Sequence, residues 1–190
     1  MLGEWMRKLF RRDGVVVEDG GANETFPPES LVIPHDDHHG TLVGRTADGD
    51  GFFITTPFTA GPRPADSREF VACYRFAPAG DLREAKIESL GSRADLVGAA
   101  RAHLLPGNAV EGNSKTRQVI ERFLAELGDV TYEDIRVRPF RVERFGIAFG
   151  LIPDSADDLD EDEDYMPHYV TLLPGNYMAF YAPWEGEYDT

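Results

Sequence analysis

The chain has 190 residues but only one cysteine, and it lacks long apolar runs. One cysteine cannot form a disulfide within the chain, and a domain of about 150 residues buries enough surface to fold without disulfides or a structural metal. No run of about 18 apolar residues occurs, so no transmembrane helix is expected. The N-terminus also lacks the apolar stretch and small-residue cleavage site of a secretory signal, which predicts a cytoplasmic protein.

Basic residues are scarce as well, with 19 Lys and Arg against 34 Asp and Glu, a formal net charge of -15. Such a charge disfavours non-specific binding to DNA, RNA and anionic lipid, which are all negative. The predicted folded part has no helix-turn-helix motif or basic patch, so no direct nucleic-acid partner is expected. A partner with a basic surface suits this charge, and the alternative is that the acidity only maintains solubility.

The single cysteine, Cys73, belongs to an apolar run at residues 70–74. No basic residue adjoins it to lower the pKa of the thiol. The pattern therefore predicts a buried thiol on a strand rather than a nucleophile.

Residues 1–30 form a predicted arm and linker. At helical spacing, residues 2–12 place five apolar side chains on one side and four basic ones around them: Leu2, Trp5, Met6, Leu9 and Phe10, with Arg7, Lys8, Arg11 and Arg12. Through Trp5, Leu9 and Phe10 this arm is suited to peripheral contact with a membrane or to a partner's groove. The alternative is a frayed arm or one docked on its own chain, because eleven residues are marginal as an isolated helix.

Residues 31–190 are predicted to form one α+β domain. Alternating apolar residues and turn signals predict antiparallel strands at 41–46, 52–56, 69–76, 82–90, 135–142, 145–152, 169–173 and 177–181. A capping box of Ser92 and Asp95 opens one predicted helix, which ends at Pro106, and a second helix runs from about Ser114 to Gly128. We expect an antiparallel sheet built from hairpins with both helices packed on one face.

The segment His35-Asp36-Asp37-His38-His39 is the best candidate for a metal or acid/base site, because imidazole and carboxylate together suit zinc, iron or manganese. The candidate ligands are His35, Asp36, His38 and His39. Its weakness is the spacing, since the segment lies between Pro34 and Gly40, where a turn is expected. A further ligand would have to come from His103, His168 or a distant acid, and the alternative is a polar loop.

An acidic loop covers residues 154–164, where eight of eleven residues are Asp or Glu. With the aromatic C-terminus it forms a candidate surface for a basic protein, through Asp157, Asp158, Asp160, Glu161, Asp162, Glu163, Asp164 and Trp184. A calcium loop does not fit, because Glu163 stands where a sharp turn requires glycine. The alternative is a solvated loop with no specific partner.

The chain also carries four segments rich in apolar residues, Gly and Pro: His38-x-x-Thr41-Leu42-Val43-Gly44-Arg45, Phe52-Phe53-Ile54-Thr55-Thr56-Pro57, Phe145-Gly146-x-x-Phe149-Gly150-Leu151-Ile152-Pro153 and Pro174-Gly175-Asn176-Tyr177-Met178-Ala179-Phe180. Over residues 31–190 they resemble a bacterial family labelled formate hydrogenlyase regulatory protein. The resemblance implies a cytoplasmic regulator and supplies no catalytic residues.

Two functional hypotheses follow. The first is a non-enzymatic, acidic regulatory protein that engages a protein partner and needs no cofactor. The second is a metal-dependent or acid/base enzyme built on the cluster at residues 35–39. The sequence carries none of the common nucleophile, dinucleotide or zinc-protease motifs, which favours the first hypothesis.

Overall fold

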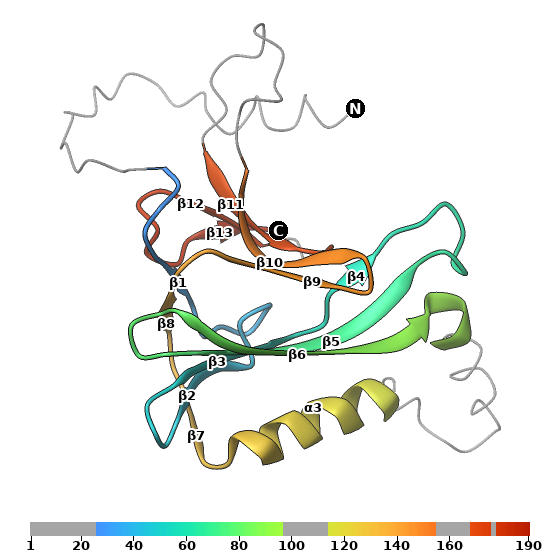
Figure 1. The fold of residues 1–190 in the computed structure, drawn as a ribbon, viewed down its shortest axis with the longest axis horizontal. Helices are drawn as coiled ribbons and strands as arrows, with labels where there is room; N and C mark the ends of the chain where they lie inside the picture. Colours follow the sequence, from blue (N-terminus) through green and yellow to red (C-terminus); the bar gives the residue numbers. More distant parts are fainter. Residues whose placement is uncertain (1–25, 97–113, 155–167, 176–177) are drawn as a thin grey trace, which may run out of the picture.

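The computed structural model describes residues 26–96, 114–154, 168–175 and 178–190 (Figure 1). Most of these residues form antiparallel strands, and a helix covers one sheet, so the predicted α+β class is confirmed. Three layers are visible in Figure 1: the helix at the bottom, a central sheet above it and a C-terminal sheet at the top. No helix in the described part is long and apolar enough to span a membrane.

The central sheet has six strands: β2 (Val43–Thr46), β3 (Gly51–Thr55), β4 (Phe58–Thr59), β5 (Arg68–Phe76), β6 (Leu82–Ser92) and β7 (Val130–Tyr132). Both predicted hairpins are present, with β2 paired to β3 and β5 paired to β6. The two hairpin turns contain Gly49 and Gly80 at φ values of 89° and 91°, which glycine adopts at little steric cost. β3 also pairs with β5, so the two hairpins form one sheet.

The C-terminal sheet has five strands in the order β13-β12-β11-β10-β9. They are β9 (Phe140–Arg144), β10 (Ile147–Asp154), β11 (Tyr169–Leu173), β12 (Ala179–Tyr181) and β13 (Tyr188–Asp189). The predicted strand at 135–142 is divided in the structure. Its first part, β8 (Ile135–Val137), pairs with β1 (Leu31–Ile33), and β9 begins after Pro139, which lacks the amide hydrogen that a central strand needs.

The main core lies between the two large sheets. Phe53, Phe70 and Tyr74 point from the central sheet towards Phe149 and other residues of the C-terminal sheet. The ring centroids of Phe70 and Phe149 are 5.2 Å apart at 86°, an edge-to-face contact. The prediction of a single sheet was therefore incomplete, because the face of the central sheet opposite the helix is covered by a second sheet.

The predicted second helix is present as α3 (Ser114–Leu127). Val119 and Phe123 are buried against Phe52, Val71 and other residues on the lower face of the central sheet, forming a second core. Each such side chain contributes about 1.5–3 kcal/mol when it is fully buried. Ion pairs of α3 with β6 flank this core, among them Lys86 Nζ to Glu126 at 2.7 Å.

The first predicted helix is described only at its start. The capping box is formed, since the amide of Asp95 donates to Ser92 Oγ at 3.1 Å and the amide of Ser92 donates to the Asp95 carboxylate at 3.3 Å. Helical residues follow from 93 to 96. The rest of this helix, the arm at residues 1–12 and most of the acidic loop lie outside the described residues.

Candidate interaction surface

The C-terminal sheet has one face buried in the main core and one face turned away from it. Side chains alternate along a strand, so the neighbours of the core residues Phe149, Leu151, Val170, Leu172 and Phe180 project to the opposite side. We call this side the outer face and define it by seven residues: Ala148, Ile152, Tyr169, Thr171, Leu173, Ala179 and Tyr181. All seven are partly exposed, and no described helix or sheet packs against them.

The strand register brings the outer-face residues together. Thr171 on β11 lies between Ile152 on β10 and Ala179 on β12. Tyr169 lies opposite Tyr181, and their ring centroids are 6.0 Å apart. The centre of the face is therefore a threonine flanked by apolar side chains, and two tyrosines form one end of the face.

Two carboxylates lie beside these tyrosines. Asp154 is the register partner of Tyr169 and accepts a hydrogen bond from its phenol, and this bond, together with burial, raises the pKa of Tyr169 to about 12. Burial and then the charge of Asp189 raise the pKa of Tyr181. Both phenols are thus neutral at physiological pH, and the single O–H of Tyr169 is donated to Asp154.

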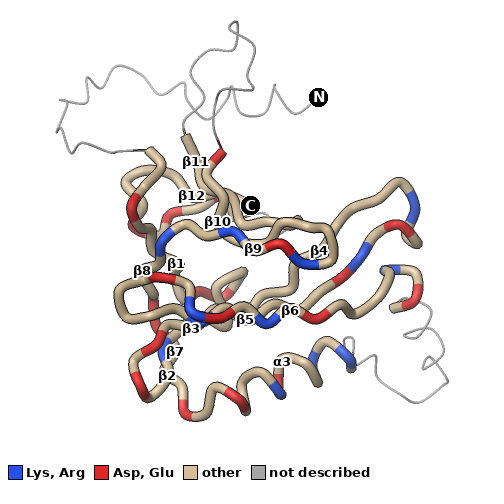
Figure 2. Tube along the Cα trace, viewed as in Figure 1, with Lys and Arg blue, Asp and Glu red and all other residues tan. Residues whose placement is uncertain are grey.

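The rest of the C-terminal sheet gives the rim of this face an uneven charge. On β9, Arg141 and Glu143 neutralise each other, with 2.6 Å between Arg141 Nη2 and Glu143 Oε1. Figure 2 shows the alternating basic and acidic residues along this strand. Two exposed carboxylates lie elsewhere on the rim, Asp154 at the end of β10 and Asp189 on the edge strand β13. The part of the rim away from β9 is therefore acidic.

The aromatic C-terminus follows the predicted alternation with one correction. Ala179 and Tyr181 project to the outer face, whereas Phe180 lies in the core, so the side chains of β12 alternate as in a regular strand. Trp184 was predicted on the partner-binding surface, but only 7% of it is exposed, and it packs against the main core. The chain turns at this residue with φ of 69°, so Trp184 does not continue the alternation of β12.

The candidate metal cluster at residues 35–39 forms a hydrogen-bonded turn. Asp36 Oδ1 accepts the backbone amides of His38 and Gly40, both at 2.8 Å, and Asp36 Oδ2 accepts the phenol of Tyr188 at 2.5 Å. Burial acts to raise the pKa of Asp36, but these hydrogen bonds outweigh it and lower the pKa. The Asp36 carboxylate therefore holds the loop at residues 35–40 against β13.

The histidines of this cluster point to different neighbours. His35 lies 5.5 Å from the ring of Tyr132, and His39 lies 6.3 Å from the ring of Tyr188. His168 stacks on Phe26, and His103 lies outside the described residues. Across 26–96, 114–154, 168–175 and 178–190, no three His, Cys, Asp or Glu side chains gather as metal ligands would, so the metal hypothesis gains no support.

Cys73 is a buried thiol on β5, as predicted. Only 3% of it is exposed, and burial raises its pKa to about 12. The thiol therefore stays protonated at physiological pH. A cavity beside it, lined also by Lys86, Phe123 and Glu126, holds at most about one water molecule.

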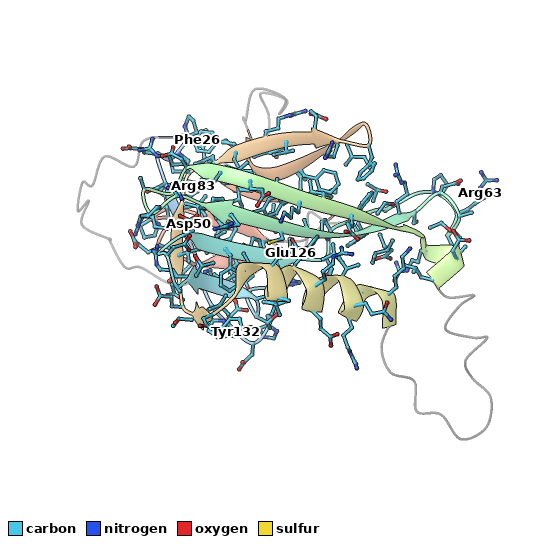
Figure 3. The ribbon with its side chains drawn as sticks, turned by 60° about the horizontal axis from the view of Figure 1, so that its bottom comes forward. Phe26, Asp50, Arg63, Arg83, Glu126 and Tyr132 are labelled. Carbon is cyan, nitrogen blue, oxygen red and sulfur yellow. The ribbon has the colours of Figure 1, made fainter. Side chains whose placement is uncertain are left out.

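One charge cluster, built around the buried carboxylate of Asp50, had no signal in the sequence. Arg83 Nη1 lies 2.7 and 2.9 Å from the two carboxylate oxygens of Asp50, and Arg75 Nη2 lies 3.2 Å from one of them. Asp50 and Arg83 are labelled in Figure 3, side by side at one end of the central sheet. Asp50 lies in the turn between β2 and β3. The structure uses it to join the β2–β3 hairpin to the β5–β6 hairpin.

The two large apolar side chains that are most exposed in the described part lie on separate elements. Tyr132 on β7 is 43% exposed and Phe145 in the β9–β10 turn is 48% exposed. Phe145 stacks on Phe70 at 5.8 Å, and the guanidinium of Arg68 lies over both rings. These residues are packed against neighbours and do not form a continuous patch, unlike the outer face.

Comparisons with protein-family models, curated proteins and solved structures found no match for this chain. The resemblance to a regulatory family therefore remains a prediction.

Proposed function

We propose that this chain is a non-enzymatic, cytoplasmic regulatory protein that binds a protein partner through the outer face of its C-terminal sheet. The proposal rests on a difference between the two large sheets: within the described residues, the central sheet is covered on both faces, and the C-terminal sheet on one. Both faces of the central sheet are covered, one by α3 and one by the C-terminal sheet, whereas the outer face is partly apolar and has no described partner.

The composition of the outer face supports a protein as its ligand. Ile152 and Ala179 flank Thr171 and make the centre largely apolar, and Tyr181 supplies a phenol beside that centre, whereas the phenol of Tyr169 already donates to Asp154. Tyrosines are enriched at the residues that dominate binding energy in protein interfaces, because one side chain offers both apolar area and a hydrogen bond.

The charge of the chain supports a basic partner. The net charge is -15, and the carboxylates of Asp154 and Asp189 lie on the part of the rim away from β9. Complementary charges at an interface mainly raise the association rate, and this effect is screened by salt. We therefore expect association to slow as the salt concentration rises.

Partner capture followed by affinity measurement tests this proposal. The purified full chain is immobilised, proteins retained from an extract of its own cells are eluted with salt and identified, and the interaction is then measured with purified components. The informative variant is Thr171→Lys, which places a long cationic side chain at the centre of the outer face. We expect it to weaken binding at least about tenfold, a cost of about 1.4 kcal/mol.

The matched control is Ala125→Lys, which makes the same change of charge at an exposed position on α3, in the layer furthest from the outer face. This variant should bind like the unmodified chain. Equal affinities for both lysine variants would contradict the proposal, because they would show that only net charge matters or that the partner binds elsewhere.

A further inference from the structure

The described chain begins at the end of the C-terminal sheet where β11 starts. Phe26, its first residue, stacks on His168 with ring centroids 4.4 Å apart and nearly parallel rings. His168 directly precedes Tyr169, the first outer-face residue of β11. Phe26 also packs against the main core and Trp184, so residues 1–25 are attached on the core side of the sheet, at the end that carries Tyr169 and Tyr181. To reach the outer face, the arm has to pass around this end of the sheet.

The length of this attached segment suits the outer face. Residues 13–25 can span up to about 45 Å when extended, so residues 2–12 can reach any part of the face. Eleven residues wound as a helix measure about 16 Å, close to the length of a five-residue strand such as β11, about 17 Å.

The chemistry of the first twelve residues complements the face. Their helical pattern groups large apolar side chains, including Trp5, Leu9 and Phe10, and it surrounds them with four basic residues in a strongly acidic chain. The outer face offers a largely apolar centre with carboxylates on one side of its rim. Resting on the function proposed above, we infer that residues 2–12 dock in cis on the outer face and cover it until a partner displaces them.

This inference specifies the kind of partner. A protein that competes with the arm for the same face must present similar chemistry, namely a basic amphipathic segment with large apolar residues on one side. The arm then acts as an internal competitor, and its effect is set by its local concentration. For a short flexible linker that concentration is on the order of 1 mM.

Trp5 provides a built-in probe, because the chain has only two tryptophans and the other, Trp184, is buried. The difference in emission between the full chain and its Trp5→Phe variant isolates the signal of Trp5. If the free arm peptide bound with a Kd on the order of 0.3 mM, the arm would be docked about three quarters of the time. Acrylamide should then quench Trp5 about fourfold less in the full chain than in a synthetic peptide of residues 1–12.

Two variants locate the docking site. Thr171→Lys should restore quenching of Trp5 to the level of the peptide, whereas Ala125→Lys should leave it protected. Leu9→Ser combined with Phe10→Ser alters only the arm, so it tests docking without a change in the folded layers, and it should also expose Trp5. Circular dichroism and the urea midpoint check that the Thr171→Lys variant is folded.

Several results would overturn the inference. Trp5 of the full chain could be quenched as strongly as in the peptide, or the two lysine variants could behave alike. Protection that increases with protein concentration would assign the face to a second copy of the chain. Protection that arises only with vesicles of anionic lipid would make the arm a membrane anchor instead.

A second measurement separates this inference from the proposed function. A labelled peptide of residues 1–12 should bind the full chain carrying Leu9→Ser and Phe10→Ser about fourfold more tightly than it binds the unmodified chain, because the competing arm is released. Equal peptide affinities would reject docking in cis. Partner binding that is still lost in Thr171→Lys would then leave the proposed function intact.

Discussion

Replacement of Asp50 by asparagine tests how the two hairpins of the central sheet are joined. Only 4% of the Asp50 side chain is exposed, whereas the side chains of its partners Arg83 and Arg75 are 55% and 30% exposed. Breaking a fully buried ion pair costs about 3–5 kcal/mol. Here both arginines can turn to water when the carboxylate is removed, so the cost falls towards the about 1.5–3 kcal/mol of a hydrogen bond to a charged group.

We therefore expect Asp50→Asn to lower the free energy of unfolding by about 2 kcal/mol, which for a chain of this length lowers the Tm by about 4–8 °C. Urea denaturation followed by circular dichroism measures this difference. Because the carboxylate is buried, the loss should persist in about 0.5 M salt, where exposed ion pairs are largely screened.

Asp48→Asn is the matched control, because Asp48 lies in the same turn and near Arg75 but has a side chain that is 66% exposed. Its loss should be clearly smaller. A stable Asp50→Asn variant, or equal losses in the two variants, would refute the view that the buried carboxylate joins the hairpins.

Three further predictions concern the cores and the loop at residues 35–40. Phe123→Ala should lower the free energy of unfolding by about 3–5 kcal/mol in urea denaturation, because it removes a buried ring from the second core. Cys73 should react with a thiol reagent only in denaturant, and rapid labelling of the native chain would contradict its burial. Burial, followed by the hydrogen bond to Asp36, raises the pKa of Tyr188 from 10 to about 12, so its contribution to stability is complete below pH 10 and lost as the pH rises towards 12. Tyr188→Phe should lose less stability over that interval in denaturation curves measured at several pH values, and an unchanged loss would assign the alkaline transition to other groups.

Much of the local structure was predictable because it follows from short-range patterns. The hairpins at β2–β3 and β5–β6 are marked by alternation and by glycine turns, and α3 is marked by apolar residues at helical spacing. The strand predicted at 177–181 is present as β12, although its alternation alone did not show which of its two faces is buried.

The arrangement of these elements was less accessible, because it depends on contacts between distant residues. At Pro139 the chain passes from β8, which pairs with β1, to β9 of the C-terminal sheet. Asp50 pairs with Arg83, which lies 33 positions away in the sequence. Trp184 lies beyond a regular strand, where alternation no longer indicates a direction. In the sequence, the outer face shows only as alternating side chains along the C-terminal strands. That no described layer covers this face becomes visible only when the whole fold is known.

The pairing of β1 with β8 and of β2 with β7 affects how the protein folds while it is synthesised on the ribosome. These pairs join residues about 100 and about 85 positions apart, and sheets with such distant contacts fold in about milliseconds to seconds. The apolar upper face of the central sheet can be covered only after the C-terminal strands have been made. At about 5–20 residues per second, Phe53 and Phe70 remain uncovered for roughly 4 to 27 s. The nascent chain is therefore expected to depend on chaperones during this interval.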